Sequence, residues 1–211
     1  MEHKMSEYCD SNKLKKLQIT ENTALEVLSV SKNKIRNMDT SKLTKLEKLY
    51  VEYNKLRRLN VTQNKKLILL NCNGNKLRKL NVKKNKSLDF LACAGNKLRS
   101  LNLSKNKLLQ YFFCYDNQLL TGNVKLAASQ LDTYEVSKQK RTVKIKKIGK
   151  NYYVPLAGVN RTNVIKNLST GKITRRGIHL SRKKIPSKIT YEYNMFTDGK
   201  IKTEVEIKVK R

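Results

Sequence analysis

Residues 67–87 read LILLNCNGNKLRKLNVKKNKS and carry the strongest pattern in the chain. The flanking stretches 46–66 and 88–108 repeat it, and the same 21-residue spacing holds across six units. Three columns define the register, one of Cys or Val, one of Asn and one of Leu or Phe. In that order they contain Cys9, Val30, Val51, Cys72, Cys93 and Cys114; Asn12, Asn33, Asn54, Asn75, Asn96 and Asn117; and Leu28, Leu49, Leu70, Leu91 and Phe112. Such a fixed period is typical of solenoids, whose units pack only on their neighbours.

Each unit begins with alternating inward and outward residues and then turns. The segment 70–73 alternates in this way, and Asn75 follows as a residue whose side chain can satisfy backbone groups in a bend. This predicts one strand of a parallel stack. The second half of the unit, 80–85, repeats nearly the same pattern, so we expect two extended sides per coil and no helix. The prediction is a mainly β solenoid of about six coils.

The repeat resembles the leucine-rich repeat of bacterial surface proteins. It is most similar to the internalin J-like subclass, in which Cys replaces a core Leu and stacks as a ladder, and the resemblance covers roughly residues 8–120. It implies a Gram-positive, non-catalytic binding or adhesion protein with a β-sandwich after the repeats. We therefore expect a secreted or cell-surface protein whose signal peptide lies outside these residues.

All four cysteines occupy a single column, so packing accounts for each of them. Cys72, Cys93 and Cys114 would lie on neighbouring rungs about 4.8 Å apart. Their Cβ vectors would be parallel, which disfavours a disulfide. We expect free thiols in the core.

The pattern changes to that of an ordinary β domain near residue 130. Apolar residues alternate with polar ones over 189–193 and 205–209, and Asp198-Gly199 between them predicts a hairpin turn. We therefore divide the chain into a leucine-rich-repeat solenoid, 1–129, and a β-sandwich of immunoglobulin-like size, 130–211.

Composition excludes several classes of function. The chain has 47 Lys and Arg residues against 16 Asp and Glu, a net charge of +31 that is spread over both halves. With two His residues and no CxxC motif, the sequence predicts no catalytic, metal or cofactor site, and no enzyme. No apolar run reaches the roughly 18–20 residues of a membrane helix, so we expect no membrane insertion. We expect a monomer.

Strand alternation also predicts a face that packing does not constrain. On it the residues vary between coils and become aromatic towards the last ones. Exposed aromatic side chains typically mark interaction surfaces. The predicted site for a protein or glycan ligand comprises Tyr50, Phe90, Tyr111, Phe113 and Tyr115. The alternative is that the C-terminal domain or its linker covers these aromatics.

A second candidate surface consists of two basic columns. They contain Lys13, Lys34, Lys55, Lys76 and Lys97, and beside them Lys15, Arg36, Arg57, Arg78 and Arg99. An anionic polymer such as teichoic acid or a glycosaminoglycan would find regularly spaced cations there. Nucleic acid is least favoured because no aromatics interleave with the cations. The other interpretations are an ordinary solvated surface and a structural spacer.

Overall fold

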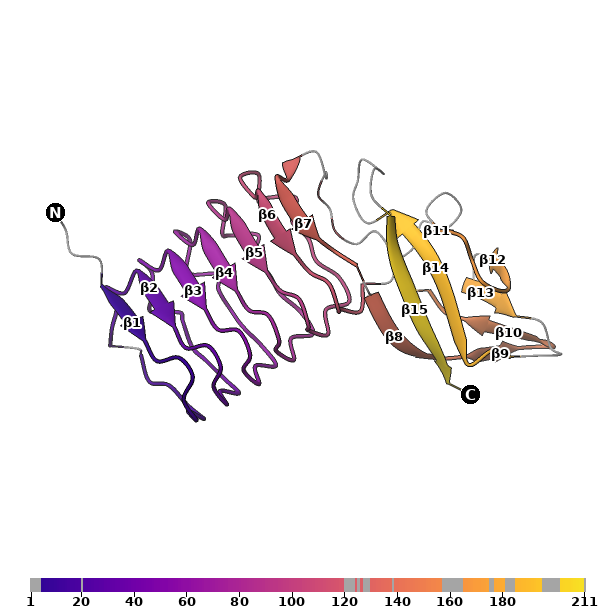
Figure 1. Ribbon diagram of the computed structural model, residues 1–211, viewed down its shortest axis with the longest axis horizontal. Helices are drawn as coiled ribbons and strands as arrows, with labels where there is room; N and C mark the ends of the chain where they lie inside the picture. The colour runs from indigo at the N-terminus through magenta and orange to yellow at the C-terminus, as the bar shows by residue number, and fades with distance from the viewer. Residues whose placement is uncertain are drawn as a thin grey trace.

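The computed structural model shows a row of parallel strands followed by two smaller sheets (Figure 1). Within the described ranges the chain forms strands, turns and bends without an α-helix. These ranges are 5–19, 21–119, 124, 126, 130–137, 139–156, 165–174, 177–180, 185–194 and 202–210. The mainly β solenoid predicted from the repeat is confirmed.

Seven short strands form the parallel sheet in chain order. They are β1 (Ser6–Tyr8), β2 (Val27–Ser29), β3 (Lys48–Tyr50), β4 (Leu69–Asn71), β5 (Phe90–Ala92), β6 (Tyr111–Phe113) and β7 (Thr133–Glu135). Corresponding residues of successive units pair directly, as Leu49 does with Leu70 and Leu70 with Leu91. The 21-residue period therefore becomes one rung of sheet per unit.

The interior of the solenoid is built from the predicted columns. Leu28, Leu49, Leu70, Leu91 and Phe112 are all fully buried. Cys72, Cys93 and Cys114 are buried free thiols, while Cys9 in the first coil is half-buried. Burial raises the pKa of the three buried thiols, which keeps them protonated at neutral pH.

The Asn column satisfies the backbone where each coil turns. Asn75 accepts a hydrogen bond from the Leu56 N–H at 3.0 Å and donates to the carbonyls of Val51 at 2.9 Å and Cys72 at 3.2 Å. Asn33, Asn54, Asn96 and Asn117 bond in the same way. A buried peptide group without a partner is costly, so this column fixes an Asn in every unit.

The second side of each coil has no strand ladder among the described residues. We expected an extended segment there; residues 80–82 belong to no strand, turns follow at 83–84 and 86–87, and one isolated bridge joins Leu101 to Val124. The Asn64 N–H donates to the Val61 carbonyl, and the Asn64 side chain donates to the carbonyls of Thr40 and Leu43 in the preceding coil. Local turn bonds and Asn side chains thus replace a strand ladder.

The sheet continues for one strand beyond the recognisable repeats. β7 follows β6 after 22 residues instead of 21, so Val136 takes the place of the cysteine column. Gln139 takes the place of the column Asn, donating to the Cys114 carbonyl and accepting from the Leu119 N–H, both at 3.0 Å. The sheet therefore runs across residue 129, where we divided the chain, and that division stays a prediction.

Two four-stranded sheets follow. Their strands are β8 (Gln139–Lys144), β9 (Lys146–Ile148), β10 (Asn151–Val154), β11 (Ile165–Lys166), β12 (Lys172–Thr174), β13 (Gly177–Leu180), β14 (Lys188–Asn194) and β15 (Lys202–Lys210). One sheet has the order β12-β13-β10-β9 and the other β11-β14-β15-β8. The predicted alternation over 189–193 and 205–209 is confirmed, with Ile189, Tyr191, Val205 and Ile207 buried. The turn predicted at 198–199 lies outside the described residues.

The second of these sheets contacts the last coil of the solenoid. Gln139 belongs both to the Asn ladder and to β8, where it is the register partner of Val205 in β15. The Tyr193 hydroxyl donates to the Leu119 carbonyl at 3.0 Å, and Tyr193 is buried. One hydrophobic cluster runs through both parts. The C-terminal sheets thus shield the end of the solenoid core.

Candidate ligand-binding face

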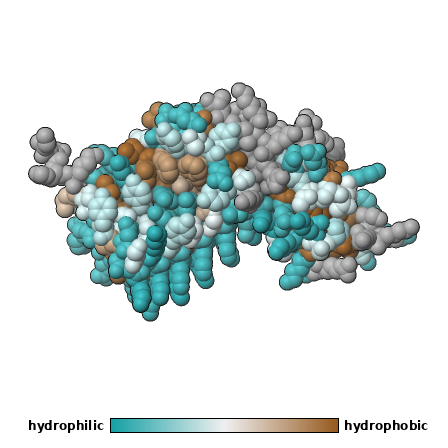
Figure 2. All heavy atoms as spheres, in the orientation of Figure 1, coloured by the Kyte–Doolittle hydropathy of each residue, from teal (hydrophilic) through white to brown (hydrophobic). Residues whose placement is uncertain are grey.

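The outward side chains of β1–β7 and of the residues just after them form one surface, which we call the sheet face. Figure 2 shows apolar side chains gathered over the middle and last strands, while hydrophilic side chains line the lower margin of the coils. Of the predicted site residues, Tyr111 is 36% exposed, and Phe90, Phe113, Tyr115 and Tyr50 are half-buried.

Three of these residues form a contiguous group, the aromatic cluster of Phe90, Tyr111 and Phe113. The ring centroids of Phe90 and Tyr111 lie 6.1 Å apart in a stacked arrangement, and those of Phe90 and Phe113 lie 5.6 Å apart. β5 and β6 position them, since Phe90 pairs with Tyr111 in register and Phe113 with Ala92. Ala92 between them is 2% exposed. Such ring pairs contribute about 0.5–1.5 kcal/mol each beyond burial of area.

Tyr115 extends the cluster towards a tyrosine that the sequence did not single out. The pKa of Tyr115 is raised by burial and then by Glu135 and Tyr53, which places these groups around it. Tyr53 is 59% exposed, and its Cδ1 lies 2.6 Å from the point where a Cβ on Gly74 would stand. Because Gly74 has no side chain, the Tyr53 ring covers that position. In the sequence, Gly74 and Gly95 occupy the repeat position of Tyr53 in the next two coils, and they were the feature from which this arrangement could have been predicted.

Tyr50 belongs to a different part of the sheet face. Its pKa is raised by burial, then by Tyr8 and by Glu52. Tyr8 is 68% exposed and lies two rungs before Tyr50, with the small Ser29 between them. The structure therefore groups Tyr50 with Tyr8 and leaves it apart from the aromatic cluster. Sequence reasoning did not identify Tyr8.

The two basic columns form a second surface, the basic edge. All ten side chains are exposed. The backbone fixes their spacing, because the Lys55 and Lys76 N–H groups donate to the Ile35 and Leu56 carbonyls of the preceding coil at 2.9 and 2.8 Å. Arg141 in β8 adds a cation near the end of this line. Its pKa is lowered by burial and then by the positive charge of Arg99, which places the two guanidinium groups near each other.

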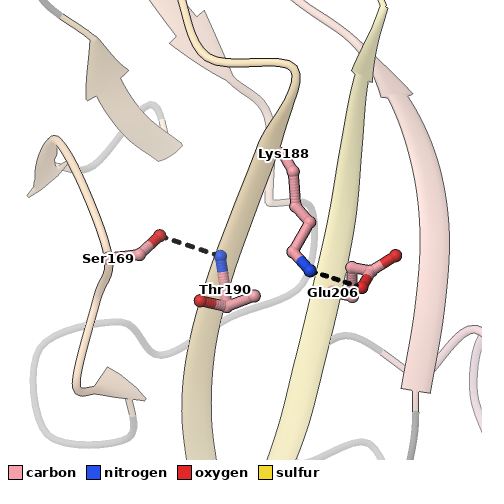
Figure 3. Close-up of polar contacts among 4 residues, drawn as sticks. All are labelled: Ser169, Lys188, Thr190 and Glu206. Carbon is pink, nitrogen blue, oxygen red and sulfur yellow. Dashed lines mark hydrogen bonds and ion pairs between the residues drawn. The ribbon is translucent and has the colours of Figure 1, made fainter.

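A hollow of about 410 Å³ lies on the second C-terminal sheet, and several of the polar side chains that line it bond to one another. Lys188 and Glu206 form an ion pair, and the Thr190 N–H donates to the Ser169 Oγ (Figure 3). The Nζ–Oε2 distance of the ion pair is 3.0 Å, and the N–Oγ distance of the hydrogen bond is 2.9 Å. Asn167 likewise donates to Glu192 at 2.9 Å. These are the contacts of an exposed sheet surface.

The described ranges also bear on metal binding and membrane insertion. Within them, no group of three or more His, Cys, Asp or Glu residues could hold a metal ion. Nor does any helix in the described part of the chain have the length and apolarity to cross a membrane.

The fold and its surfaces define a leucine-rich-repeat solenoid with a cysteine ladder. A scan against protein-family models and a search of curated proteins give no match. Among solved structures, the chain is similar to the functional domain of InlJ from Listeria monocytogenes, which includes a cysteine ladder. The TM-score is 0.60 at 20% identity, over 96% of this chain and 52% of that one.

Two further structures share the fold. An internalin, InlF, from Listeria monocytogenes has a TM-score of 0.55 at 19% identity, over 64% of this chain and 41% of that one. The leucine-rich-repeat protein LIC12759 from Leptospira interrogans has a TM-score of 0.53 at 21% identity, over 65% and 42%. The chain thus spans about half or less of these proteins. The fold resemblance inferred from the repeat is confirmed.

Proposed function

We propose that this chain is a non-catalytic binding module of a bacterial surface or secreted protein. It recognises a protein or glycan through the sheet face, centred on the aromatic cluster. The observation that supports this best is three neighbouring aromatic rings on a face where the solenoid requires none. Phe90, Tyr111 and Phe113 occupy outward columns that hold Val27, Lys48, Leu69 and Asn71 in other coils.

The exposure of the cluster supports a ligand rather than internal docking. Tyr111 in the cluster keeps 36% of its surface exposed, and Tyr53, which lies near Tyr115 at the margin of the cluster, keeps 59%. Large aromatic side chains give much contact area for little loss of conformational entropy, so they commonly dominate binding energy. The similarity to InlJ and InlF supports a surface location.

Two triple variants test the site. The face variant carries Phe90→Ser, Tyr111→Ser and Phe113→Ser, and the edge variant carries Arg57→Gln, Arg78→Gln and Arg99→Gln. Circular dichroism and thermal unfolding check that both fold. Peptide and glycan arrays are then probed with all three proteins. We expect ligands that bind the wild type and the edge variant and are lost in the face variant.

Two results would oppose the proposal. An unfolded face variant would assign the aromatics a structural role, and single substitutions of Tyr111 and Tyr115 would then probe binding separately. Array ligands that remain bound to a folded face variant would place binding elsewhere.

We also propose a second candidate function, attachment to an anionic polymer through the basic edge. Neighbouring cations about 4.8 Å apart repel by roughly 0.9 kcal/mol in water, and a polyanion would relieve this. The continuation of the line by Arg141 favours it. On a heparin column the wild type should elute at higher salt than the edge variant. Equal elution of the two rejects this function.

A further inference from the structure

Charge is segregated between the sheet face and the rest of the solenoid. We define a strand segment as each strand of β1–β7 with one residue before it and three after it. In residues 1–138 these segments hold nine acidic and three basic residues, whereas the remainder holds three acidic and 24 basic. A chain of net charge +31 therefore carries a net negative strip along its aromatic side.

The acidic side chains closest to the aromatics lie at the end of the sheet. Glu135 in β7 is the register partner of Phe113 and is exposed. Asp116 is also exposed, and after burial both carboxylates contribute to the raised pKa of Tyr115. Within the described part of the chain, neither carboxylate forms an ion pair with Lys or Arg. Aromatic rings and carboxylates thus share one solvent-facing area.

Two of the three basic residues of the strand segments, Lys32 and Lys48, lie far from this area, and the third, Lys138, lies outside the described residues. Lys48 is three rungs before β6, which corresponds to about 14 Å along the sheet. That exceeds the screening length of about 8 Å at physiological ionic strength. Lys32 lies a further rung away. Among the described strand-segment charges, those nearest to Phe113 and Tyr115 are therefore the carboxylates of Asp116 and Glu135.

An aromatic ring beside a carboxylate is the environment that a guanidinium or ammonium group favours. The cation stacks on the ring face while its N–H groups bond to the carboxylate, and arginine does both at once. An anionic polymer would instead meet carboxylates here, and the basic edge would attract it elsewhere. The net charge of the chain repels cationic ligands at long range, so only a matched local contact retains them.

We infer that the sheet face binds a protein segment presenting Arg or Lys side chains, held between the aromatic cluster, Tyr115 and the carboxylates of Asp116 and Glu135. This rests on the proposed function, because it specifies the partner of the same surface. The recognition is local, since it operates against the overall charge of the chain.

The test uses three short fluorescein-labelled peptides with the complete chain. They share the same tyrosines and glycines and carry Arg, Gln or Glu at the remaining positions. Fluorescence anisotropy measures their affinity. We expect the Arg peptide to bind more tightly than the Gln peptide. We also expect Asp116→Asn with Glu135→Gln to weaken the Arg peptide about three- to tenfold, leaving the Gln peptide unchanged.

A charge-matched control separates local from overall electrostatics. Glu21→Gln with Asp39→Asn also removes two negative charges, but from exposed positions outside the strand segments. This variant should bind the Arg peptide as the wild type does. An equal loss in both double variants would attribute the effect to net charge and overturn the inference.

The remaining outcomes distinguish the inference from the function on which it rests. If the Arg and Gln peptides bind equally and both are lost in the face variant, the aromatic site stands and its preference for cations is wrong. If the Arg peptide does not bind at all, the inference is wrong. The proposed function is then tested separately by the array experiment with the face and edge variants. Any binding of the Glu peptide should be weaker in the edge variant than in the wild type.

Discussion

Neighbouring residues of the same strands follow opposite rules in this solenoid. Leu70, Leu91 and Phe112 face the interior and are fully buried, and the positions they occupy hold large apolar residues in successive coils. Outward neighbours such as Asn71 and Tyr111 change character from coil to coil. Packing explains the first set but not the second. Variation on a regular scaffold therefore marks the surface where function is to be sought.

The same contrast separates two kinds of asparagine. Asn75 is buried and bonds to four backbone groups, whereas Asn81 is exposed and accepts one bond from the Lys83 N–H. If its side chain is removed, water can replace the hydrogen bond of the exposed Asn81 but cannot reach the groups that the buried Asn75 satisfies. The rule for this fold is that the interior fixes both the apolar and the polar residues of the repeat.

The largest effect is expected from breaking this ladder. Asn75→Ala leaves buried backbone groups without partners and should lower the free energy of unfolding by about 3–5 kcal/mol. The matched change Asn81→Ala should cost less than about 1 kcal/mol, because water replaces its bond. Urea unfolding measures both. Similar losses for the two variants would contradict the assigned role of the column.

The cysteine ladder predicts a loss of stability at high pH. Burial raises the pKa of Cys72, Cys93 and Cys114 above the ordinary value of 9.0. A group whose pKa is raised by folding stabilises the protein fully below its unfolded pKa, and this contribution is lost at higher pH, where the unfolded chain ionises. The stability should therefore fall above about pH 9, by about 1.4 kcal/mol per thiol at pH 10.

Replacing the three thiols with Val isolates this effect. Val30, Val51 and Val136 already occupy the column in other coils, so the triple variant should keep the fold at neutral pH. Its free energy of unfolding should decline less steeply between about pH 8 and pH 10. Parallel pH profiles for the variant and the wild type would show that the thiols do not contribute.

A smaller effect is expected where interior and face meet. Gly74 and Gly149 have φ angles of 62° and 58°, so an Ala at either position costs about 1 kcal/mol of backbone strain. A Cβ at Gly74 would also meet the Tyr53 ring, whereas nothing lies within 4 Å at Gly149. In thermal unfolding, Gly74→Ala should therefore have a lower Tm than Gly149→Ala. Tyr53 ring signals in NMR spectra should move only in the former, and unchanged signals would contradict the contact.

The smallest effect on stability belongs to the sheet face itself. Tyr111→Ser removes a ring that is 36% exposed and stacks on Phe90, so the expected loss is about 1 kcal/mol, well below that of Asn75→Ala. Urea unfolding against the wild type checks this value. A loss comparable to that of Asn75→Ala would mean that Tyr111 is part of the core and not of a binding surface.

The sequence predicted the solenoid well because its interactions recur at a fixed spacing. The columns of Leu28, Cys72 and Asn75 could be read directly, and the structure confirms them as interior. The second side of the coil, predicted as extended from the alternation at 80–82, forms no strand there, and local turn bonds and Asn side chains hold its backbone. β7 was missed because one inserted residue and the change from Asn117 to Gln139 break the pattern.

The C-terminal sheets were less predictable. Strand positions at 189–193 and 205–209 follow from local alternation. The parallel pairing of β8 with β15 joins Gln139 to Val205 and has no local signature. For the site, alternation placed Phe90 and Phe113 outward. The approach of Tyr53 to Tyr115 depends on Gly74 and Gly95 on the two rungs between them, and only the structure revealed it.

Binding through the sheet face is tested most directly by an NMR footprint of the tightest array peptide on the isotope-labelled chain. We expect backbone amide shifts to concentrate at residues 89–95 and 110–116, with Lys34, Lys55 and Lys76 unaffected. Shifts confined to the basic edge or to β8–β15 would contradict the sheet face as the binding surface.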